Sequence, residues 1–342
     1  MKQNINWGII GLGNIALQFS EAFQDTKNSK LKAISSKNLN KMKIFQEKHN
    51  INKKYCFNEY EQLLKCEDID VVYIALPNSM HAEWIKKTIN SKKNILVEKP
   101  AFINLQDAEE IKIKLIDSNL FFSEGFMYRY TPLIDKVIEI IKKNIIGKPT
   151  SMISNFGVNL LTKKNIFGFS KKKKVDKNNR LFSKKLGGGS ILDLGCYPVS
   201  FSCLIASIIS KIDYDKIKIL DKKKEFGETD VDVNSSLDIE FDNGFVSKVK
   251  TSFSKNLGTE TIIYGSNGVL RVKNPWLAET SIIILEGKMK EEIKVEFSKN
   301  IYSYEIDAIS KNLLEAKFKP DFPGVSIDET IGATKILHEW LK

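Results

Sequence analysis

The first part of the chain alternates short apolar runs with segments of helical periodicity. Apolar runs bounded by turn residues predict buried strands, and the segments between them predict helices. The predicted strands are Ile5–Ile10, Leu31–Ser35, Asp70–Leu76, Asn94–Glu98 and Leu120–Glu124. The predicted helices are Asn14–Gln24, Asn40–His49, Ser79–Asn90 and Leu105–Asp117. This order, with strands that are apolar on both faces, predicts a parallel, doubly wound sheet of the Rossmann type.

After about residue 150 the pattern changes to alternating polar and apolar residues. Period-two segments of this kind predict an antiparallel sheet with one face exposed or covered by a partner. Two turn sequences, Asp242–Gly244 and Gly265–Gly268, predict hairpins. The predicted strands are Ser151–Leu161, Ile217–Lys224, Val231–Phe241, Phe245–Phe253, Thr261–Tyr264, Ser281–Leu285 and Glu292–Phe297. The predicted helices are Pro198–Ile209, Tyr302–Ala316 and Ser326–Trp340.

Together the two patterns predict an α/β domain followed by an α+β domain. We place the Rossmann dinucleotide-binding domain at residues 1–123 and a substrate-binding and oligomerisation domain at residues 124–342. The second domain is expected to hold a large, mostly antiparallel, open-faced sheet, and its last helix can pack back on the first domain. A length of 342 residues is typical of two domains.

The formal net charge of +11 does not by itself indicate nucleic-acid binding. Proteins that read bases rely on arginine, and this chain has arginine at positions 129, 180 and 271. The run Lys171–Lys174 lies beside Asp176, which favours a solvated loop, with a patch for an anionic ligand or a nucleic acid as the alternative. The apolar runs are far shorter than the ~20 residues of a membrane-spanning helix. The four cysteines match no zinc-binding spacing, so we expect reduced thiols, no metal site and a cytoplasmic protein.

The segment Gly11-Leu-Gly13-Asn14-Ile15-Ala16 follows the first strand directly and opens the first helix. This context is the one that a dinucleotide-binding turn requires. The first glycine permits the tight turn, the second lets the backbone approach a pyrophosphate, and the small Ala16 keeps the helix close to the sheet. Unpaired N–H groups at the helix start would then face the phosphates. An ordinary tight turn between strand and helix is the alternative.

The end of the second predicted strand bears on the choice between NADP and NAD. NAD sites usually carry an acid about 20 residues after the glycines, which binds the ribose 2′-hydroxyl. This chain instead has Ser35, Ser36 and Lys37 there. Because a cation attracts a 2′-phosphate that a carboxylate would repel, the sequence favours NADP over NAD. The alternative is that Ser36 and Lys37 simply begin a surface turn.

Two further motifs follow the third and fourth predicted strands, where ligands bind to sheets of this kind. The motifs are Leu76-Pro77-Asn78-Ser-Met-His81 and Glu98-Lys99-Pro100. We take these residues as further candidates for the cofactor site. His81 is either part of the nicotinamide pocket or a histidine at a helix start without a function, and Lys99 is either a reacting group or a surface lysine before a proline turn.

The motifs GLGNIA, PNSMHAE, VEKP and GGGSILDLGCYP occur in this order and together resemble the Gfo/Idh/MocA oxidoreductases. The resemblance runs over roughly residues 5 to 340. The segments Glu124–Tyr130 and Arg180-Leu-Phe, with the tyrosine of GCYP, are most similar to the branch of trans-dihydrodiol dehydrogenases and NADP-dependent D-xylose 1-dehydrogenases. The resemblance implies an open-faced sheet that is often used for dimerisation.

The resemblance also implies that Lys99 and Tyr197 carry the chemistry. Many members have a histidine at the position of Tyr197, four residues after an aspartate; here Asp193 is kept and tyrosine replaces the histidine. That departure argues against an Asp–His acid/base pair. Loss of a hydride from a carbinol carbon requires an acceptor for the O–H proton, and a nearby lysine makes a tyrosine better suited to this role. Pro198 would start the helix, with Tyr197 at its positive end; a core tyrosine is the alternative.

The remaining candidates belong to the substrate side. Arg129, with Tyr128 beside it, either contacts the substrate or cofactor or forms a structural ion pair, and Arg180 lies beside a family motif. The run Gly187–Gly189 indicates a close backbone approach or a flexible linker. We expect the loops Phe156–Phe169 and Asn274–Trp276 to set the shape of the substrate pocket.

The leading interpretation is an enzyme that oxidises a sugar, cyclic polyol or trans-diol with NADP, or that runs the reverse reaction. One alternative is a keto-sugar or nucleotide-sugar reductase in surface-polysaccharide synthesis, whose substrate diphosphate would need several basic residues at the pocket. The other is a non-catalytic NADP-sensing regulator, which has no need to keep both Lys99 and Tyr197. We expect a homodimer or homotetramer with a small polyhydroxylated substrate and no nucleic-acid or membrane partner.

Overall fold

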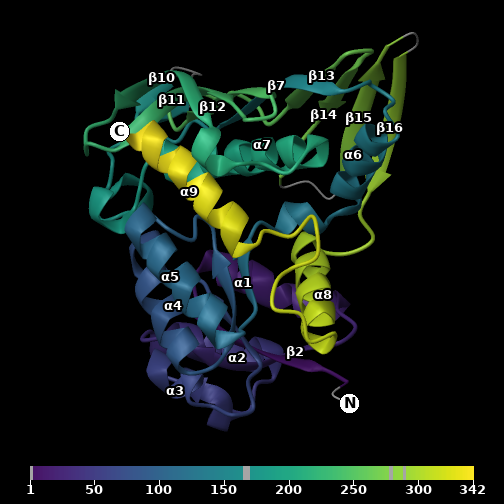
Figure 1. Ribbon diagram of the computed structural model, residues 1–342. Helices are drawn as coiled ribbons and strands as arrows, with labels where there is room; N and C mark the ends of the chain where they lie inside the picture. The colour runs from purple at the N-terminus through teal and green to yellow at the C-terminus, as the bar shows by residue number, and fades with distance from the viewer. Residues whose placement is uncertain (1–2, 165–169, 277–279, 288–289) are drawn as a thin grey trace. The chain divides into compact units, whose positions relative to one another are not determined.

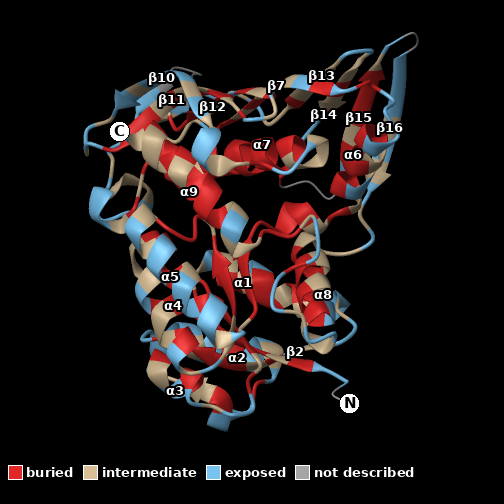
Figure 2. Cartoon of the chain, viewed as in Figure 1, coloured by how far each residue is buried: buried red, intermediate tan, exposed pale blue. Residues whose placement is uncertain are grey.

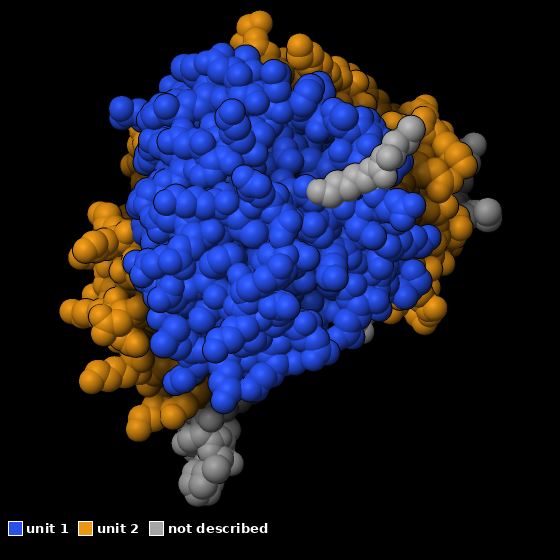
Figure 3. Space-filling view, turned by 90° about the horizontal axis from the view of Figure 1, so that it is seen from below, with its two compact units in different colours: residues 1–131, 298–331 blue, residues 132–297, 332–342 orange. Residues whose placement is uncertain are grey.

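The computed structural model describes residues 3–164, 170–276, 280–287 and 290–342. Their contacts form two compact units, coloured in Figure 3. Unit 1 comprises residues 1–131 and 298–331, and unit 2 comprises residues 132–297 and 332–342. The predicted domain boundary at residue 123 stays a prediction.

Unit 1 is built on a parallel sheet of six strands in the order β3-β2-β1-β4-β5-β6. The strands are β1 (Ile5–Ile10), β2 (Ser29–Ser35), β3 (Cys56–Phe57), β4 (Val71–Ile74), β5 (Asn94–Glu98) and β6 (Phe122–Gly125). Strands β4 and β6 are buried throughout, and the predicted doubly wound parallel sheet is confirmed. In Figure 2 these strands form the buried centre of the unit.

Helices cover this sheet (Figure 1). They are α1 (Asn14–Glu21), α2 (Leu39–His49), α3 (Tyr60–Leu64), α4 (His81–Asn90), α5 (Leu105–Ser118) and α8 (Ile301–Leu314). Helix α8 comes from the C-terminal part of the chain, and Ser310 explains its place: its hydroxyl accepts a 3.0 Å hydrogen bond from Trp7 Nε1 and a 2.7 Å one from the Ser29 hydroxyl. A helix distant in sequence thereby completes the core of unit 1.

Unit 2 is built on an eight-stranded sheet in the order β10-β11-β12-β7-β13-β14-β15-β16. The strands are β7 (Pro149–Gly157), β10 (Lys218–Phe226), β11 (Asp232–Glu240), β12 (Val246–Ser252), β13 (Thr261–Gly265), β14 (Val269–Val272), β15 (Thr280–Glu286) and β16 (Lys290–Glu296). All pairs are antiparallel except β12 with β7. The predicted large, mostly antiparallel sheet is confirmed, and a small hairpin, β8 (Thr162–Lys164) with β9 (Ser170–Lys172), stands beside it.

The helices of unit 2 are α6 (Pro132–Lys142) and α7 (Cys196–Ile209), and α9 (Ile327–Leu341) begins in unit 1 and ends in unit 2. Helix α7 packs against β7 and β12. Within the described chain, the stretch Lys184–Ile209 has the length and apolar composition of a membrane-spanning helix, yet 89% of its most apolar window is buried. Such burial is the property of a core helix in a globular protein.

A buried aspartate fixes the entry into α7. Asp232 Oδ2 accepts hydrogen bonds from the Ser190 hydroxyl at 2.6 Å and from Ile191 N at 2.8 Å. Gly189 has φ +113°, and a β-carbon there would clash with Asp232 Oδ1. Gly187 is left-handed at φ +74°, and a β-carbon on Gly188 would lie 2.6 Å from the carbonyl oxygen of Arg180. Gly187 is therefore required by its left-handed conformation, and Gly188 and Gly189 by close packing, so the three glycines do not form a linker.

The structure corrects several predicted elements. The short β3 and α3 and the whole of α6 were missed, as were β14 and the hairpin of β8 and β9. Strand β7 ends at Gly157 and not at Leu161. The predicted start of α7 at Pro198 was wrong, because a π-helical segment over Ile191–Gly195 leads directly into α7 at Cys196. Asp232 caps the start of this helical stretch by accepting the N–H of Ile191.

We expect Asp232→Ala to lower the free energy of unfolding by about 2–4 kcal/mol, because it leaves the Ser190 hydroxyl and Ile191 N–H buried without an acceptor. Urea unfolding followed by circular dichroism measures this. The matched control is Asp221→Ala on β10, where the carboxylate is exposed and the change should be within about 0.5 kcal/mol. Equal effects in the two variants would contradict the capping role.

Candidate functional site

The turn after β1 has the geometry that a dinucleotide-binding turn needs. Gly11 has φ +89°, and a β-carbon on it would lie 2.6 Å from the carbonyl oxygen of Ala75. Gly13, which precedes α1, differs: its missing β-carbon faces open space, with no atom of the described residues within 4 Å. Tight packing therefore requires Gly11, whereas only something outside the chain could require Gly13.

The start of α1 points its peptide groups at the same space. Gly13 cannot cap the helix with a side chain, so the first N–H groups of α1, beginning with Asn14 and Ile15, remain available to a ligand. Asn14 is exposed, Ile15 half-buried, and Ala16 fully buried against the sheet. A helix N-terminus of this kind favours an anion such as a phosphate.

The residues after β2 offer hydroxyl groups and a cation but no carboxylate. The Ser35 hydroxyl donates to the carbonyl oxygen of Phe57 at 2.9 Å, so its proton is already used within the sheet. The Ser36 hydroxyl oxygen accepts the N–H of Asn38 at 3.1 Å, which leaves its own proton to be donated. Lys37 is exposed, with its ammonium 5.9 Å from the centroid of the Tyr60 ring. Ser36 and Lys37 can therefore bind a phosphate, while Ser35 holds the strand ends together.

Buried side chains hold the loop that carries Lys99. The N–H of Lys99 donates to Glu98 Oε2 at 3.2 Å, and the N–H of Ala101 donates to Glu124 Oε1 at 2.9 Å. The carbonyl oxygen of Pro100 lies 2.9 Å from Nδ1 of His81. The side chain of Lys99 itself is partly exposed. The loop is thus fixed by its surroundings in unit 1.

The histidine that follows the Pro77-Asn78 motif is fully buried and bound at both ring nitrogens. Besides Pro100, its Nε2 lies 2.8 Å from the carbonyl oxygen of Leu76. Asn78 is buried in the short turn that leads into α4. The two predicted motifs, after β4 and after β5, are therefore joined directly by His81.

Carboxylates gather under this loop to an extent that the sequence did not reveal. The Tyr73 hydroxyl donates to Glu98 Oε1, and burial raises the pKa of Tyr73 well above its usual value. Burial, reinforced by the nearby charge of Glu98, likewise raises the pKa of Glu305 on α8. Burial raises the pKa of Glu124 to about 7, against the lowering effect of the Ala101 N–H. Two members of this group of buried ionisable side chains, Glu98 and Glu124, bind main-chain N–H groups of the Lys99 loop, and Tyr73 and Glu305 interact with Glu98.

Arg129 belongs to the same buried region. Its guanidinium has no exposed surface, forms an ion pair with Glu329, and donates to the carbonyl oxygen of Pro323 at 3.3 Å. Tyr128 beside it is also fully buried. The observed ion pair matches the structural alternative that the sequence left open for Arg129.

In unit 2, Tyr197 lies in an aromatic pocket. Its ring centroid is 5.4 Å from that of Phe156 and 5.8 Å from that of Trp276, and both rings are tilted to it. Both residues belong to the two loops that we expected to shape the substrate pocket, although residues 165–169 of the first loop lie outside the described residues. Tyr197 is buried one turn inside the helical stretch that starts at Ile191, so it is not at the positive end of a helix.

The other unit 2 candidates form one ion pair. Arg180 Nη1 donates to Asp193 Oδ1 at 3.0 Å, with half of the arginine side chain exposed. Cys196 Sγ donates to the carbonyl oxygen of Asp193 at 3.6 Å, which agrees with a packing role for the thiol. Lys99 belongs to unit 1, and Tyr197, Asp193 and Arg180 belong to unit 2.

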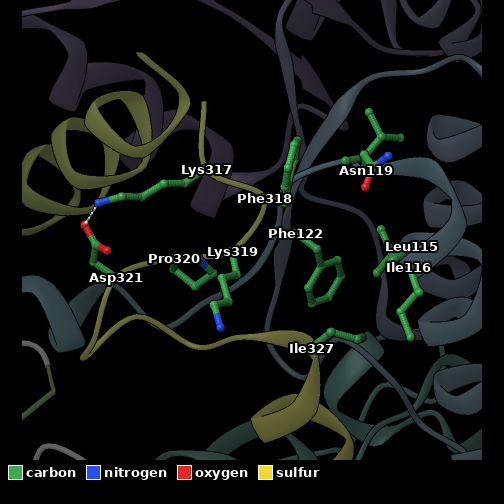
Figure 4. Close-up of a pocket in the computed structure, with 11 residues that line it drawn as sticks. Leu115, Ile116, Asn119, Phe122, Lys317, Phe318, Lys319, Pro320, Asp321 and Ile327 are labelled. Carbon is green, nitrogen blue, oxygen red and sulfur yellow. Dashed lines mark hydrogen bonds and ion pairs between the residues drawn. The ribbon is translucent and has the colours of Figure 1, made fainter. Parts of the chain in front are cut away.

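A separate pocket of about 460 Å³ opens on unit 1 between the end of α5 and residues 317–327 (Figure 4). Its lining is mainly apolar, with Leu115, Phe122 and Phe318 among the walls, and Lys317 at its edge is paired with Asp321. None of the predicted site residues lines it. Among the described residues, no group of three or more histidine, cysteine, aspartate or glutamate side chains could hold a metal ion.

Sequence comparison matches both parts of the chain. Residues 5–126 match the model of the Gfo/Idh/MocA oxidoreductase family, described as an NAD-binding Rossmann fold, and residues 134–271 match the model of the Gfo/Idh/MocA C-terminal domain. Trans-1,2-dihydrobenzene-1,2-diol dehydrogenase of Xenopus tropicalis is 27% identical over 98% of this chain and 97% of its own length. The Mus musculus enzyme of the same name is 26% identical over 84% of this chain and 79% of its own.

Solved structures share the fold over almost the whole chain. Aldose-aldose oxidoreductase from Caulobacter crescentus superposes with a TM-score of 0.84 at 17% identity, covering 99% of this chain and 96% of its own. KijD10, a 3-ketoreductase from Actinomadura kijaniata in complex with NADP and TDP-benzene, gives a TM-score of 0.81 at 21% identity, covering 98% and 96%. At these identities the two structures establish the fold alone.

We expect Gly13→Val to weaken NADPH binding at least tenfold, while the midpoint of thermal unfolding stays near that of the wild type, because the added side chain meets open space in the chain but would block a bound pyrophosphate. Gly11→Val should instead lower the midpoint, because it strains a left-handed residue packed on Ala75. Fluorescence titration and thermal unfolding separate the two. Unchanged NADPH affinity in Gly13→Val would rule out this turn as the phosphate site.

Proposed function

Because the chain belongs to the Gfo/Idh/MocA oxidoreductase family, we propose that it is an NADP-dependent dehydrogenase that acts on a carbinol carbon of a sugar, cyclic polyol or trans-diol. The single observation that carries the proposal is the turn after β1, where Gly13 leaves open space in front of the α1 N-terminus. The diol dehydrogenases among its relatives support the substrate class.

The residues present fit NADP. Gly11, Gly13 and the first residues of α1 would hold the pyrophosphate, and Ser36 with Lys37 would hold the 2′-phosphate. We place the nicotinamide half beside the ends of β4 and β5. The residues there are Leu76, Pro77, Asn78 and His81, which follow β4, and Glu98, the last residue of β5. When bound, the nicotinamide supplies the hydride acceptor or donor. NADP in the complex of KijD10 supports this choice of coenzyme.

Tyr197 is the proposed acid/base. When a carbinol is oxidised its hydroxyl proton must leave, and a phenolate oxygen in the apolar setting of Phe156 and Trp276 can accept it. In the reverse direction the phenol returns the proton to the forming alkoxide. Removing the hydroxyl of Tyr197 should therefore stop turnover without disturbing the aromatic packing.

Lys99 has two proposed tasks. Its ammonium stabilises the phenolate of Tyr197, and it donates to the substrate oxygen as negative charge develops there. Asp193 and Arg180 are proposed to act as a pair: the carboxylate orients the guanidinium, which can contact substrate hydroxyl groups through its exposed half. A cytoplasmic homodimer or homotetramer remains part of the proposal.

A second candidate is a keto-sugar reductase that takes a nucleotide-activated sugar. The observation that favours it is the exposed basic segment formed by Lys171–Lys174 and Lys177, with Lys184 and Lys185 further along. Such a segment suits a substrate diphosphate. TDP-benzene in the complex of KijD10 supports the same class. Lys172 is paired with Glu228, so part of this charge is already compensated.

We expect NADPH to bind at least tenfold more tightly than NADH, and Lys37→Glu to abolish that preference, because a carboxylate would repel the 2′-phosphate. The matched control is Lys30→Glu, the same charge change near the opposite end of β2. Isothermal titration with both coenzymes measures the four affinities. Equal wild-type affinities, or equal losses in the two variants, would contradict the roles of Ser36 and Lys37.

We expect turnover of NADP⁺ with one class in a panel of aldoses, cyclitols, trans-diols and nucleotide sugars, followed by nicotinamide absorbance. Tyr197→Phe and Lys99→Ala should each lower kcat about 100-fold or more, with the NADPH dissociation constant changed less than threefold. Tyr264→Phe on β13 is the control for loss of a phenol hydroxyl. Unchanged turnover in Lys99→Ala would remove it from the mechanism; turnover of nucleotide sugars alone would favour the second candidate.

A further inference from the structure

Three successive residues of the Lys99 loop have a main-chain group bound by a buried ionisable side chain. Lys99 N–H is bound by Glu98, the Pro100 carbonyl oxygen by His81 and Ala101 N–H by Glu124. Loops are usually held by backbone contacts or by water, because burying an ionisable group is costly. The concentration of such groups on one short loop therefore indicates that its position matters beyond stability.

His81 has a geometry that few side chains can supply. Its two nitrogens lie 2.9 and 2.8 Å from the carbonyl oxygens of Pro100 and Leu76, which follow the neighbouring strands β5 and β4. Both partners are acceptors, so both nitrogens must donate, and only the imidazolium form has two N–H groups. The two N–H groups of an imidazolium diverge, whereas a side-chain amide presents its two N–H bonds from one nitrogen. The ring can thus bridge two loops that an asparagine or glutamine could not.

Buried carboxyl groups contact the loop on both sides of Pro100. The carboxylates of Glu98 on β5 and Glu124 on β6 accept from the peptide groups that flank Pro100. On α4 itself the acid nearest in sequence, Glu83, is mostly exposed and paired with Lys87 at 2.8 Å. The acidic groups that contact this loop therefore come from β5 and β6, and not from the helix that carries His81.

We propose that His81 and Glu124 are positioning residues that together fix the backbone of the Lys99 loop, with His81 acting as a doubly protonated bridge between the Leu76 and Pro100 carbonyls. This inference rests on the proposed function of Lys99. His81 binds the carbonyl oxygen of Pro100 in the loop and that of Leu76 after β4, so it ties the two segments together. Glu124 accepts the N–H of Ala101 and so holds the next residue of the loop. The two act from opposite sides, so loss of either lets the Lys99 ammonium drift from its reacting position.

The first test is kinetic, and it separates the role of Glu124 as a hydrogen-bond acceptor from any role of its charge. Glu124→Gln keeps a carbonyl oxygen for Ala101 N–H, so kcat should stay within threefold of the wild type. Glu124→Leu loses the acceptor, and His81→Gln loses the bridge, so each should lower kcat about 10- to 100-fold with less than threefold change in KM. His49→Gln, a half-buried histidine on α2, is the matched control and should leave kcat unchanged.

Two results would overturn the positioning role. One is an unchanged kcat in both Glu124→Leu and His81→Gln. The other is a rise in KM or in the NADPH dissociation constant with kcat preserved, which would make His81 a binding residue. For a His81→Gly variant, partial recovery of kcat by added imidazole is the expected result. If the variants fold poorly, as thermal unfolding would reveal, this rescue still tests the bridge.

The second test does not depend on activity, so it separates this inference from the proposed function. The chain has three histidines, which makes ring ¹⁵N signals simple to assign by comparison with His81→Gln. At pH 7.5, where an unperturbed imidazole (pKa near ~6.5) is mostly neutral, His81 should show two protonated nitrogens. One unprotonated nitrogen would overturn the bridge. Two protonated nitrogens in a protein that turns over no substrate would leave the bridge intact and refute the proposed function.

Discussion

The parallel pairing of β1, β4, β5 and β6 is the constraint on which the unit 1 site depends. Ile10 pairs with Ile74, Ile74 with Val97, and Val97 with Glu124, so the strands end together at one edge of the sheet. Each following loop then contributes one part of the site: the glycine turn, the Pro77-Asn78 turn and the Lys99 loop. No loop has to be long, because the register brings residues as far apart in sequence as Ile10 and Ile74 to neighbouring strand ends.

The parts of the fold that the sequence predicted are those with strong local patterns. Buried parallel strands and alternating antiparallel strands each have their own periodicity, and the glycine turn is marked by its place between strand and helix. The missed α6 did carry a signal, since it begins with Pro132 and has apolar residues at helical spacing. Strand β3, by contrast, has two residues and owes its existence to β2 beside it, so its own sequence holds little information.

The site was predictable in its residue types but not in its connections. Asp232 lies about 40 residues from the helix start that it caps. Because the helical stretch begins there and not at Pro198, Tyr197 lies inside it and not at its N-terminal end. Gly189 similarly packs against Asp232, a residue distant from it in sequence. The sequence marked Glu124 only as the first residue of a family motif and did not mark Glu305, because burial beside other ionisable groups is not visible in a linear pattern.

Buried ionisable groups in unit 1 are stabilised in two different ways, and the difference agrees with the proposed role of Lys99. Arg129 and Glu329 neutralise each other as a pair, which is the usual solution for buried ions. Around Lys99 the arrangement differs: Glu98 is shared between the Tyr73 hydroxyl and a main-chain N–H, and Glu305 has an oxygen without a hydrogen-bond partner among the described residues. Burial raises the pKa of Glu305, so it can avoid charge by holding a proton. A fold that needed only stability would replace such groups with apolar ones, so their cost is best explained by the need to fix one loop.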